Sequence, residues 1–261
     1  MLQLTELNII IDNLNIYVLV FVRVAALIAF NPLMARQNVP SMARTGIVFF
    51  TTLLLAPLVP IPENMDSSDL VFGIAREIAV GWLMGYIFNI FFYMLAYVGD
   101  ILDMQFGLSM AKVMDPGTGV QSAFTGNLIN LVYMAYFFVT NSHLVLIKLA
   151  VDSYNLIPAG APNINIQAAA VFGINLFTSI FSLAVRLAFP FVATEFILEM
   201  GMGVLMKLIP QIHIFVINMQ FKILLAIVML FVLAGPITVF IENYIIILFD
   251  YMNEGLAALV S

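Results

Sequence analysis

Charged side chains stand within or beside long apolar runs, and their chemistry is the first feature that needs an explanation. They are Arg23, Arg76, Glu77, Arg186, Glu195, Glu199 and Lys222. An ionised group at the centre of a bilayer costs about 2.5–3.5 kcal/mol on insertion scales. These groups must therefore form pairs, reach water or be buried against protein.

One ion pair follows from residue spacing. Pro210-Gln211 is expected to form the turn of an antiparallel helical hairpin, with Glu199 and Lys222 equally far before and after it. The two side chains would then stand at the same height on facing helices, and Glu195 lies one turn from Glu199 on the same face. Two interpretations follow, a structural ion pair and a proton relay of the kind that intramembrane carboxylates often mark. Arg186 is a further candidate for a structural ion pair.

Motifs for catalysis or cofactor binding are absent from the sequence. It has 0 Cys, which removes thiolate chemistry, and its His143 and His213 lie far apart. No Walker, Rossmann, H-E-x-x-H or G-x-S-x-G motif occurs. The sequence therefore predicts a protein that is not an enzyme and holds no cofactor or metal.

Composition indicates a membrane protein. Of 261 residues, 63% are hydrophobic and 9% are charged, whereas soluble domains carry about 25% charged residues. Too few polar residues remain to cover a water-exposed surface, and no polar block is long enough for a soluble domain. The net charge of −6 argues against binding to nucleic acid.

Several apolar runs are long enough for membrane helices. Ile78–Val98 contains no charge and, at about 1.5 Å per residue, covers roughly 30 Å. The other runs are Ile9–Phe30, Ile47–Val59, Leu128–Val139, Ala168–Phe189, Phe191–Ile209, Ile212–Ala234 and Ile237–Phe249. Their lack of period-two alternation favours helices over a β-barrel. The predicted fold is all-α, an integral membrane protein of kinked helical hairpins.

Proline and glycine positions predict irregular helices. Pro57, Pro60 and Pro62 should break the second helix, Pro190 should kink or break a later one, and Gly235-Pro236 should interrupt the last. By contrast, Gly81-x-x-x-Gly85 fits close helix packing.

A segment rich in Gly, Asp and Met lies between Gly99 and Gly126. Asp115-Pro116-Gly117 is a strong turn signal, and Asp100 and Asp103 would share one helix face. The segment is too polar to face lipid, and its glycines weaken an isolated helix. Composition leaves two interpretations open. One is an extramembrane loop with an amphipathic turn, and the other is a re-entrant loop that lines or closes a pore with Phe and Met as the seal.

An ordered series of short motifs runs over most of the chain. In order, these are Arg23 and Pro32; Glu77, Gly81 and Gly85; Gly99-Asp100-Ile101-Leu102-Asp103-Met104-Gln105-Phe106-Gly107, continuing through Ala111 to Asp115-Pro116; Asn141-Ser142-His143 with Ser153, Pro158 and Gly160; Pro190; and Pro210-Gln211 with Phe215 and Lys222. With this series the sequence resembles the FliR/SctT family of type III secretion export-gate subunits. It departs from the family pattern at Ser142, His213 and Gln220, where Gly, Asn and Pro are usual.

The resemblance implies a non-enzymatic subunit of the bacterial flagellar export gate. In that family the chain joins FliP and FliQ in a hetero-oligomeric ring, the membrane entrance for unfolded flagellar proteins, with FlhB and FlhA adjacent. The expected place is the inner membrane within the flagellar basal body, partly raised to the periplasmic side. Residues 1–165 would be FliP-like with a pore loop at 100–125, and residues 166–261 would form a FliQ-like hairpin.

The resemblance also assigns roles to residues. It favours the pore-closing interpretation of the glycine-rich segment and makes the Glu199–Lys222 pair an assembly contact. The pore-loop candidates are Met104, Phe106, Met110, Met114, Asp115, Pro116, Gly117 and Gly119. The structural ion-pair candidates are Glu195, Glu199, Lys222 and Arg186.

Two other functions remain open on the sequence. The first is an export-gate subunit of a virulence injectisome, which would handle effector proteins. The second is a proton-coupled secondary transporter that works alone, with its carboxylates around a site at the membrane midplane.

Overall fold

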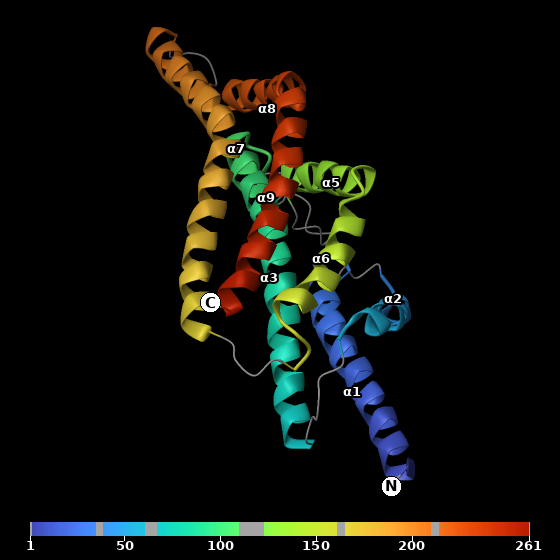
Figure 1. Cartoon of the computed structure of the whole chain (residues 1–261). Helices are drawn as coiled ribbons and strands as arrows, with labels where there is room; N and C mark the ends of the chain where they lie inside the picture. The colour runs from blue at the N-terminus through green and yellow to red at the C-terminus, as the bar shows by residue number, and fades with distance from the viewer. Residues whose placement is uncertain are drawn as a thin grey trace. The chain divides into compact units, whose positions relative to one another are not determined.

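The computed structural model of the chain is built from α-helices (Figure 1). It describes residues 2–34, 39–60, 67–109, 123–160, 165–209 and 214–260, and no β-strand occurs in these ranges. The predicted all-α class is confirmed. Within these described ranges, four helices are long and apolar enough to cross a membrane, and a fifth span results if α5 and α6 count as one broken span.

The helices have these bounds: α1 Leu2–Ala29, α2 Ser41–Leu55, the 3-10 turn η1 Ala56–Leu58, α3 Ser67–Gln105, α5 Phe124–Val139, α6 Ser142–Leu156, α7 Ile166–Leu208, α8 Ile214–Val232 and α9 Ala234–Val260. α3 has 39 residues and α7 has 43. At about 1.5 Å per residue each is roughly 60 Å long, twice the hydrocarbon thickness of about 30 Å. An average tilt of about 20° does not absorb such an excess.

Pro190 does not break its helix. α7 continues through Pro190, so the two apolar runs on either side of it form one helix. A proline inside a helix removes only one backbone donor, and the Pro190 carbonyl is itself used, accepting the Thr194 hydroxyl at 2.7 Å. Of the kink or break expected at this position, the break does not occur.

The break before the last helix lies earlier than Gly235-Pro236. α8 ends at Val232, and Leu233 separates it from α9. Pro236 is the third residue of α9, where no intrahelical donor is required, so it fits within the first turn. The prediction for Pro57 is confirmed, because α2 ends at Leu55 and Pro57 stands at the start of η1.

The described chain forms two compact units. One comprises residues 1–90, 141–176 and 247–261, and the other comprises residues 91–140 and 177–246. We call them unit 1 and unit 2. α3, α7 and α9 each have residues in both units, so the boundaries of the units differ from the expected division at residue 165. That division concerns the resemblance of each part to FliP or FliQ, and it stays a prediction.

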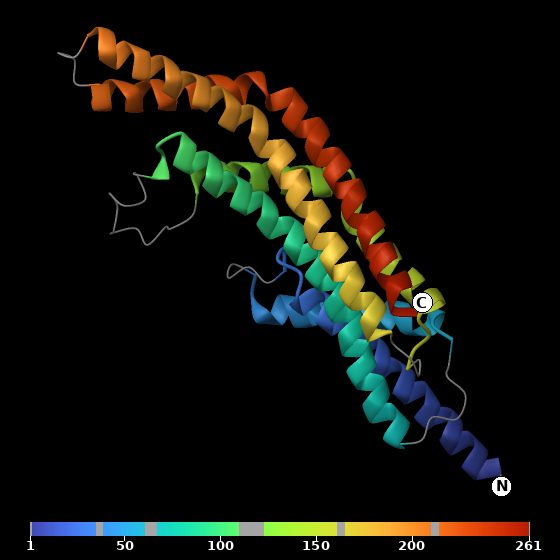
Figure 2. The same ribbon diagram turned by 90° about the vertical axis from the view of Figure 1, so that its left-hand side faces the viewer.

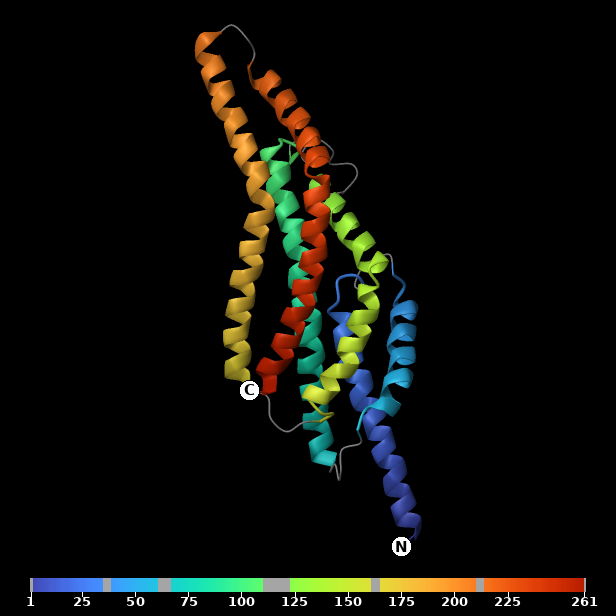
Figure 3. The same cartoon turned by 45° about the horizontal axis from the view of Figure 1, so that its top comes forward.

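In unit 1, α1 packs closely on the first part of α3, and α2 lies beside the later part of α1 (Figure 3). A Cβ atom at Gly81 would collide with the Arg23 carbonyl oxygen, and one at Gly85 would meet Phe30. The close packing expected of this glycine pair is therefore confirmed. It brings the backbone of α3 against that of α1 at the level of Arg23.

In unit 2, the end of α3 and the start of α5 pack closely together. A Cβ atom at Gly99 would collide with the backbone of Gly126. Residues 100–105 belong to α3 and residues 124–125 to α5, so the expected pore loop at 100–125 is too long at both ends. Glycine has a low helix propensity, so the contact between Gly99 and Gly126 helps to stabilise the two helix ends in which they lie.

Candidate functional site

A buried ion pair lies within unit 1. The guanidinium of Arg23 donates to both carboxylate oxygens of Glu77, through Nε to Oε2 and through Nη2 to Oε1 at 3.0 Å. Both side chains are 1% exposed. This is the bidentate geometry that makes an arginine–carboxylate pair strong and directional.

The remaining hydrogen-bonding groups of the pair also have partners. Arg23 donates to the Ser153 hydroxyl at 3.0 Å and to the Ile157 carbonyl at 2.9 Å, and Gly160 N–H donates to Glu77 Oε1 at 2.9 Å. The Tyr154 ring lies 3.8 Å from the guanidinium carbon, a cation–π contact. We call these residues the arginine cluster.

Local geometry explains how the turn after α6 reaches this pair. Gly160 has a φ of 70°, a left-handed conformation that glycine adopts without strain. That conformation aims its N–H at the Glu77 carboxylate. The cluster is closed to solvent and offers no free acid, base or nucleophile, so its effect is to join α1, α3 and α6.

Sequence reasoning missed the arginine cluster. Arg23 and Glu77 were both recognised as charges that need partners, but they lie 54 positions apart and share no hairpin turn. Ser153 and Gly160 were noted only as motif positions. The opposite charges of Arg23 and Glu77 could have suggested the pair, because two charges in separate apolar runs can form an ion pair with each other.

A second ionic cluster lies in unit 2, where Figure 2 shows the C-terminal part of α7 beside α8. The Lys222 ammonium is 3.0 Å from Glu195 Oε1, contacts Glu199 Oε1, and lies 3.4 Å from the Gln105 carbonyl oxygen. We call this the lysine cluster. The hairpin register predicts this contact, while the turn residues Pro210 and Gln211 lie outside the described residues.

The lysine cluster differs in burial and charge from the arginine cluster. Glu195 is fully buried, whereas the Glu199 side chain is 49% exposed. Two carboxylates face one ammonium, so the cluster carries one formal negative charge in excess. Lys222 also binds a carbonyl at the C-terminal end of α3, where a cation is favourable. Arg186 stays outside the cluster, exposed on α7, and forms no ion pair with the residues that the structure describes.

The first residues of the predicted pore loop lie next to the lysine cluster. Phe106 is fully buried and packs edge-on against Phe191 of α7, with ring centroids 6.0 Å apart. Met104 is 70% exposed at the end of α3. The other pore-loop candidates, Met110, Met114, Asp115, Pro116, Gly117 and Gly119, lie outside the described residues.

A carboxylate connects the two ends of this loop. The backbone N–H of Thr125, in the first turn of α5, donates to Asp103 Oδ1 at 3.0 Å. Asp103 is buried, and a carboxylate at a helix N-terminus satisfies a backbone donor that lacks an intrahelical partner. The sequence placed Asp103 on a helix face with Asp100 but gave it no partner, because the contact spans the whole loop.

Metal binding has no support within the described ranges. No group of three or more His, Cys, Asp or Glu side chains there is arranged to hold an ion. His143 stands in the first turn of α6, while His213 lies outside the described part of the chain.

These features define an all-α membrane protein in which Arg23, Glu77 and Glu195 are buried in contacts between helices. Comparison with known protein families places it further: the model of bacterial export proteins, family 1, matches residues 14–246. The chain therefore belongs to that family.

Individual relatives cover most of the chain. It is 28% identical to the flagellar biosynthetic protein FliR of Bacillus subtilis, over 96% of this chain and 98% of the relative. The Escherichia coli FliR is 27% identical over 95% of this chain and 94% of the relative. The Yop proteins translocation protein T of Yersinia pestis is 30% identical over 79% and 80%. The resemblance expected from the motifs is confirmed.

The arginine cluster makes a testable prediction about stability. Arg23→Met or Glu77→Leu alone leaves a buried charge unpaired and is expected to cost about 3–5 kcal/mol of unfolding free energy. The double substitution removes both charges and is expected to recover most of that loss. Thermal unfolding of the purified chain in detergent measures both. The exposed Glu242→Gln serves as the control, and single variants that match it would contradict the prediction.

The lysine cluster makes a second prediction. Lys222→Glu places three carboxylates together, and Glu199→Lys places two ammonium groups together, so each single change is expected to reduce the yield of folded protein. The double swap restores opposite charges and is expected to recover part of that yield. Size-exclusion chromatography of detergent extracts measures it, with Lys207→Glu as a control on an exposed part of α7. No recovery in the double swap rules out the pairing.

Proposed function

We propose that this chain is a non-enzymatic subunit of the bacterial flagellar type III protein export gate. The observation that carries the proposal is similarity to FliR proteins along almost the whole chain, within a family match over residues 14–246. The motif series found in the sequence supports the same function.

The virulence injectisome is the second candidate. The Yersinia protein named for Yop translocation is slightly more identical, at 30%, but it is matched over 79% of this chain. The flagellar relative from Bacillus subtilis is matched over 96%. Near-complete coverage of both chains favours the flagellar function.

Partners in a ring are the next part of the proposal. The C-terminal part of α7 and the described side chains of α8 include many large apolar groups that are exposed. These are Phe196, Ile197, Met200, Val204, Leu224, Ile227 and Phe231. Exposed apolar surface on this scale marks a contact with protein or membrane. We assign it to FliP and FliQ subunits, with FlhB and FlhA adjacent and unfolded flagellar proteins as the cargo.

The inner membrane and a position partly raised to the periplasmic side belong to the same proposal. α3 and α7 are each roughly twice as long as a bilayer is thick, so about half of each helix must lie outside the hydrocarbon. Protein partners would cover that half. The FliP-like part at residues 1–165 and the FliQ-like hairpin at 166–261 would supply matching surfaces.

Closure of the pore by the glycine-rich loop is the last part. Its described base is firmly held, with Phe106 packed on Phe191, Lys222 on the Gln105 carbonyl, and Asp103 joined to Thr125. These contacts hold both ends of the glycine-rich loop in place. The methionine and glycine residues between them would form the adaptable seal.

The function is tested in a strain that lacks this chain. Deletion is expected to abolish motility and export of filament protein, and the intact gene should restore both. When the chain is co-expressed with FliP and FliQ, native mass spectrometry of the inner-membrane extract should show one complex. A lone monomer in that extract would favour a transporter that works alone.

The loop is tested by ion permeability. Deleting Gly117–Gly119 from the assembled complex is expected to let small ions leak across the resting membrane, because the seal is shortened. A membrane-potential dye reports the leak. Gly173→Ala, at a site with open space around the Cβ position, is the control. Unchanged permeability in an assembled complex contradicts closure by this loop.

A further inference from the structure

Two buried oxygen atoms at the contact between α3 and α5 have no hydrogen-bond partner. They are Asp103 Oδ2 and Thr125 Oγ1. Asp103 is 1% exposed and Thr125 is 0% exposed, and the Thr125 N–H joins the two residues by donating to Asp103 Oδ1 at 3.0 Å. A buried polar atom without a partner is unfavourable, and a buried carboxylate without an opposite charge is more so. The contact therefore lacks a component that would satisfy it.

The charge of Asp103 is not balanced by the part of the chain that the structure describes. No Lys, Arg or His side chain there forms an ion pair with it. Lys222 lies at the same end of α3, but Glu195 and Glu199 already oppose its single charge. The N-terminus of α5 supplies about half a positive charge, and the C-terminal end of α3 supplies about half a negative one, so the two dipoles cancel. A net negative charge stays buried at this contact.

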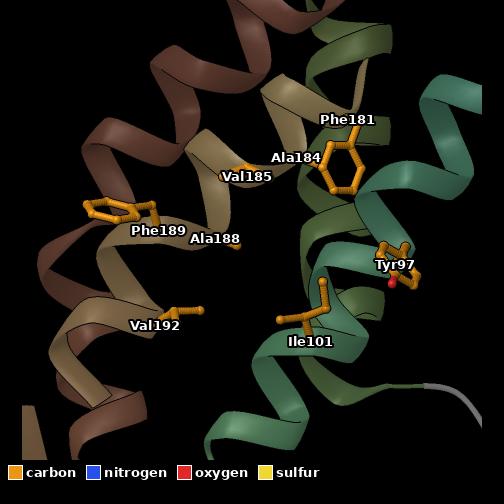
Figure 4. A pocket seen from close by; sticks show the side chains of 8 residues that line it. All are labelled: Tyr97, Ile101, Phe181, Ala184, Val185, Ala188, Phe189 and Val192. Carbon is orange, nitrogen blue, oxygen red and sulfur yellow. The ribbon is translucent and has the colours of Figure 1, made fainter. Parts of the chain in front are cut away.

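The other side of α3 offers no polar group to this site. It borders an apolar groove of about 260 Å³ shared with α7, and Figure 4 shows Tyr97 and Ile101 on α3 and Ala184 on α7 at its walls. Asp103 follows Ile101 by two residues, a rotation of about 200° around the helix. The carboxylate therefore belongs to the opposite face, which packs on α5, and the groove is separate from the contact.

Three occupants differ in what they satisfy at the two oxygens. A water molecule could donate to Asp103 Oδ2 and bond to Thr125 Oγ1, but it would leave the negative charge in place. A proton on Oδ2 would remove the charge, but it would add a buried donor without an acceptor. A cation of charge +1 balances the carboxylate and accepts lone pairs from both oxygens, so it satisfies charge and polar atoms together.

We propose that Asp103 and Thr125 bind a monovalent alkali cation between α3 and α5. Alkali and alkaline-earth ions prefer oxygen ligands, and a carboxylate, a hydroxyl and the carbonyl end of a helix supply them. A divalent ion would leave an excess positive charge beside one carboxylate, and clusters of three acidic or His side chains that suit such ions do not occur among the described residues. The bound cation ties together the two helix ends from which the glycine-rich loop leaves.

The test measures thermal unfolding of the full chain, purified in detergent, in NaCl, KCl or choline chloride at equal ionic strength. Choline is too large for a buried site, so its salt controls for screening between charges. At about ten times the dissociation constant, at least one alkali salt is expected to raise the unfolding midpoint by roughly 3–5 °C over choline chloride. The rise should saturate as one site per chain is filled.

Matched variants locate the bound ion. Asp103→Asn keeps the acceptor for the Thr125 N–H but removes the charge, so it is expected to abolish the difference between the salts. Thr125→Val removes only the hydroxyl and should weaken the apparent affinity by about tenfold, while Thr125→Ser should retain it. Asp100→Asn, an exposed carboxylate of the same helix, is the control and should keep the full response.

Three results would overturn the proposal. Equal midpoints in all salts for the unchanged chain would mean that water alone fills the contact. A midpoint that depends on pH but not on the cation, and loses that dependence in Asp103→Asn, would mean that a proton does. A salt response that survives Asp103→Asn would place the ion elsewhere. If Asp103→Asn does not fold, the comparison of Thr125→Val with Thr125→Ser decides, because equal affinities in that pair exclude the hydroxyl as a ligand.

Discussion

The buried ion pair of Arg23 and Glu77 is the constraint on which unit 1 depends. An unpaired charge in an apolar interior costs several kcal/mol, so neither helix can take its position without the other. The pair sets the height at which α1 meets α3, and the glycines of α3 let the two backbones approach at that height. Ser153 and the Gly160 amide then attach α6 and the turn after it, since each satisfies a remaining hydrogen-bonding group.

The lysine cluster also pairs opposite charges from different helices, but it is partly exposed to solvent and has one more carboxylate than ammonium. It connects α7, α8 and the end of α3. Together with the Asp103–Thr125 hydrogen bond, it fixes both ends of the glycine-rich loop.

Helix length and exposed apolar surface show that this chain presents apolar faces that membrane or protein must cover. α3 and α7 exceed the thickness of a bilayer twofold, and the helices outside it would face water without other subunits. Membership of the bacterial export family agrees with this physical need, because its relatives take part in flagellar biosynthesis and Yop translocation by name.

The sequence by itself determined the helical membrane class and the approach of Lys222 to Glu199. These follow from composition, from apolar length and from the register of one hairpin, all of which are local properties. Tertiary structure alone decided the pairing of Arg23 with Glu77, the Gly99–Gly126 contact and the partner of Asp103. It also decided that α7 runs unbroken through Pro190 and that the last break falls at Leu233. The physical reason is range: contacts between distant segments satisfy charges and backbone groups in ways that local propensity does not encode.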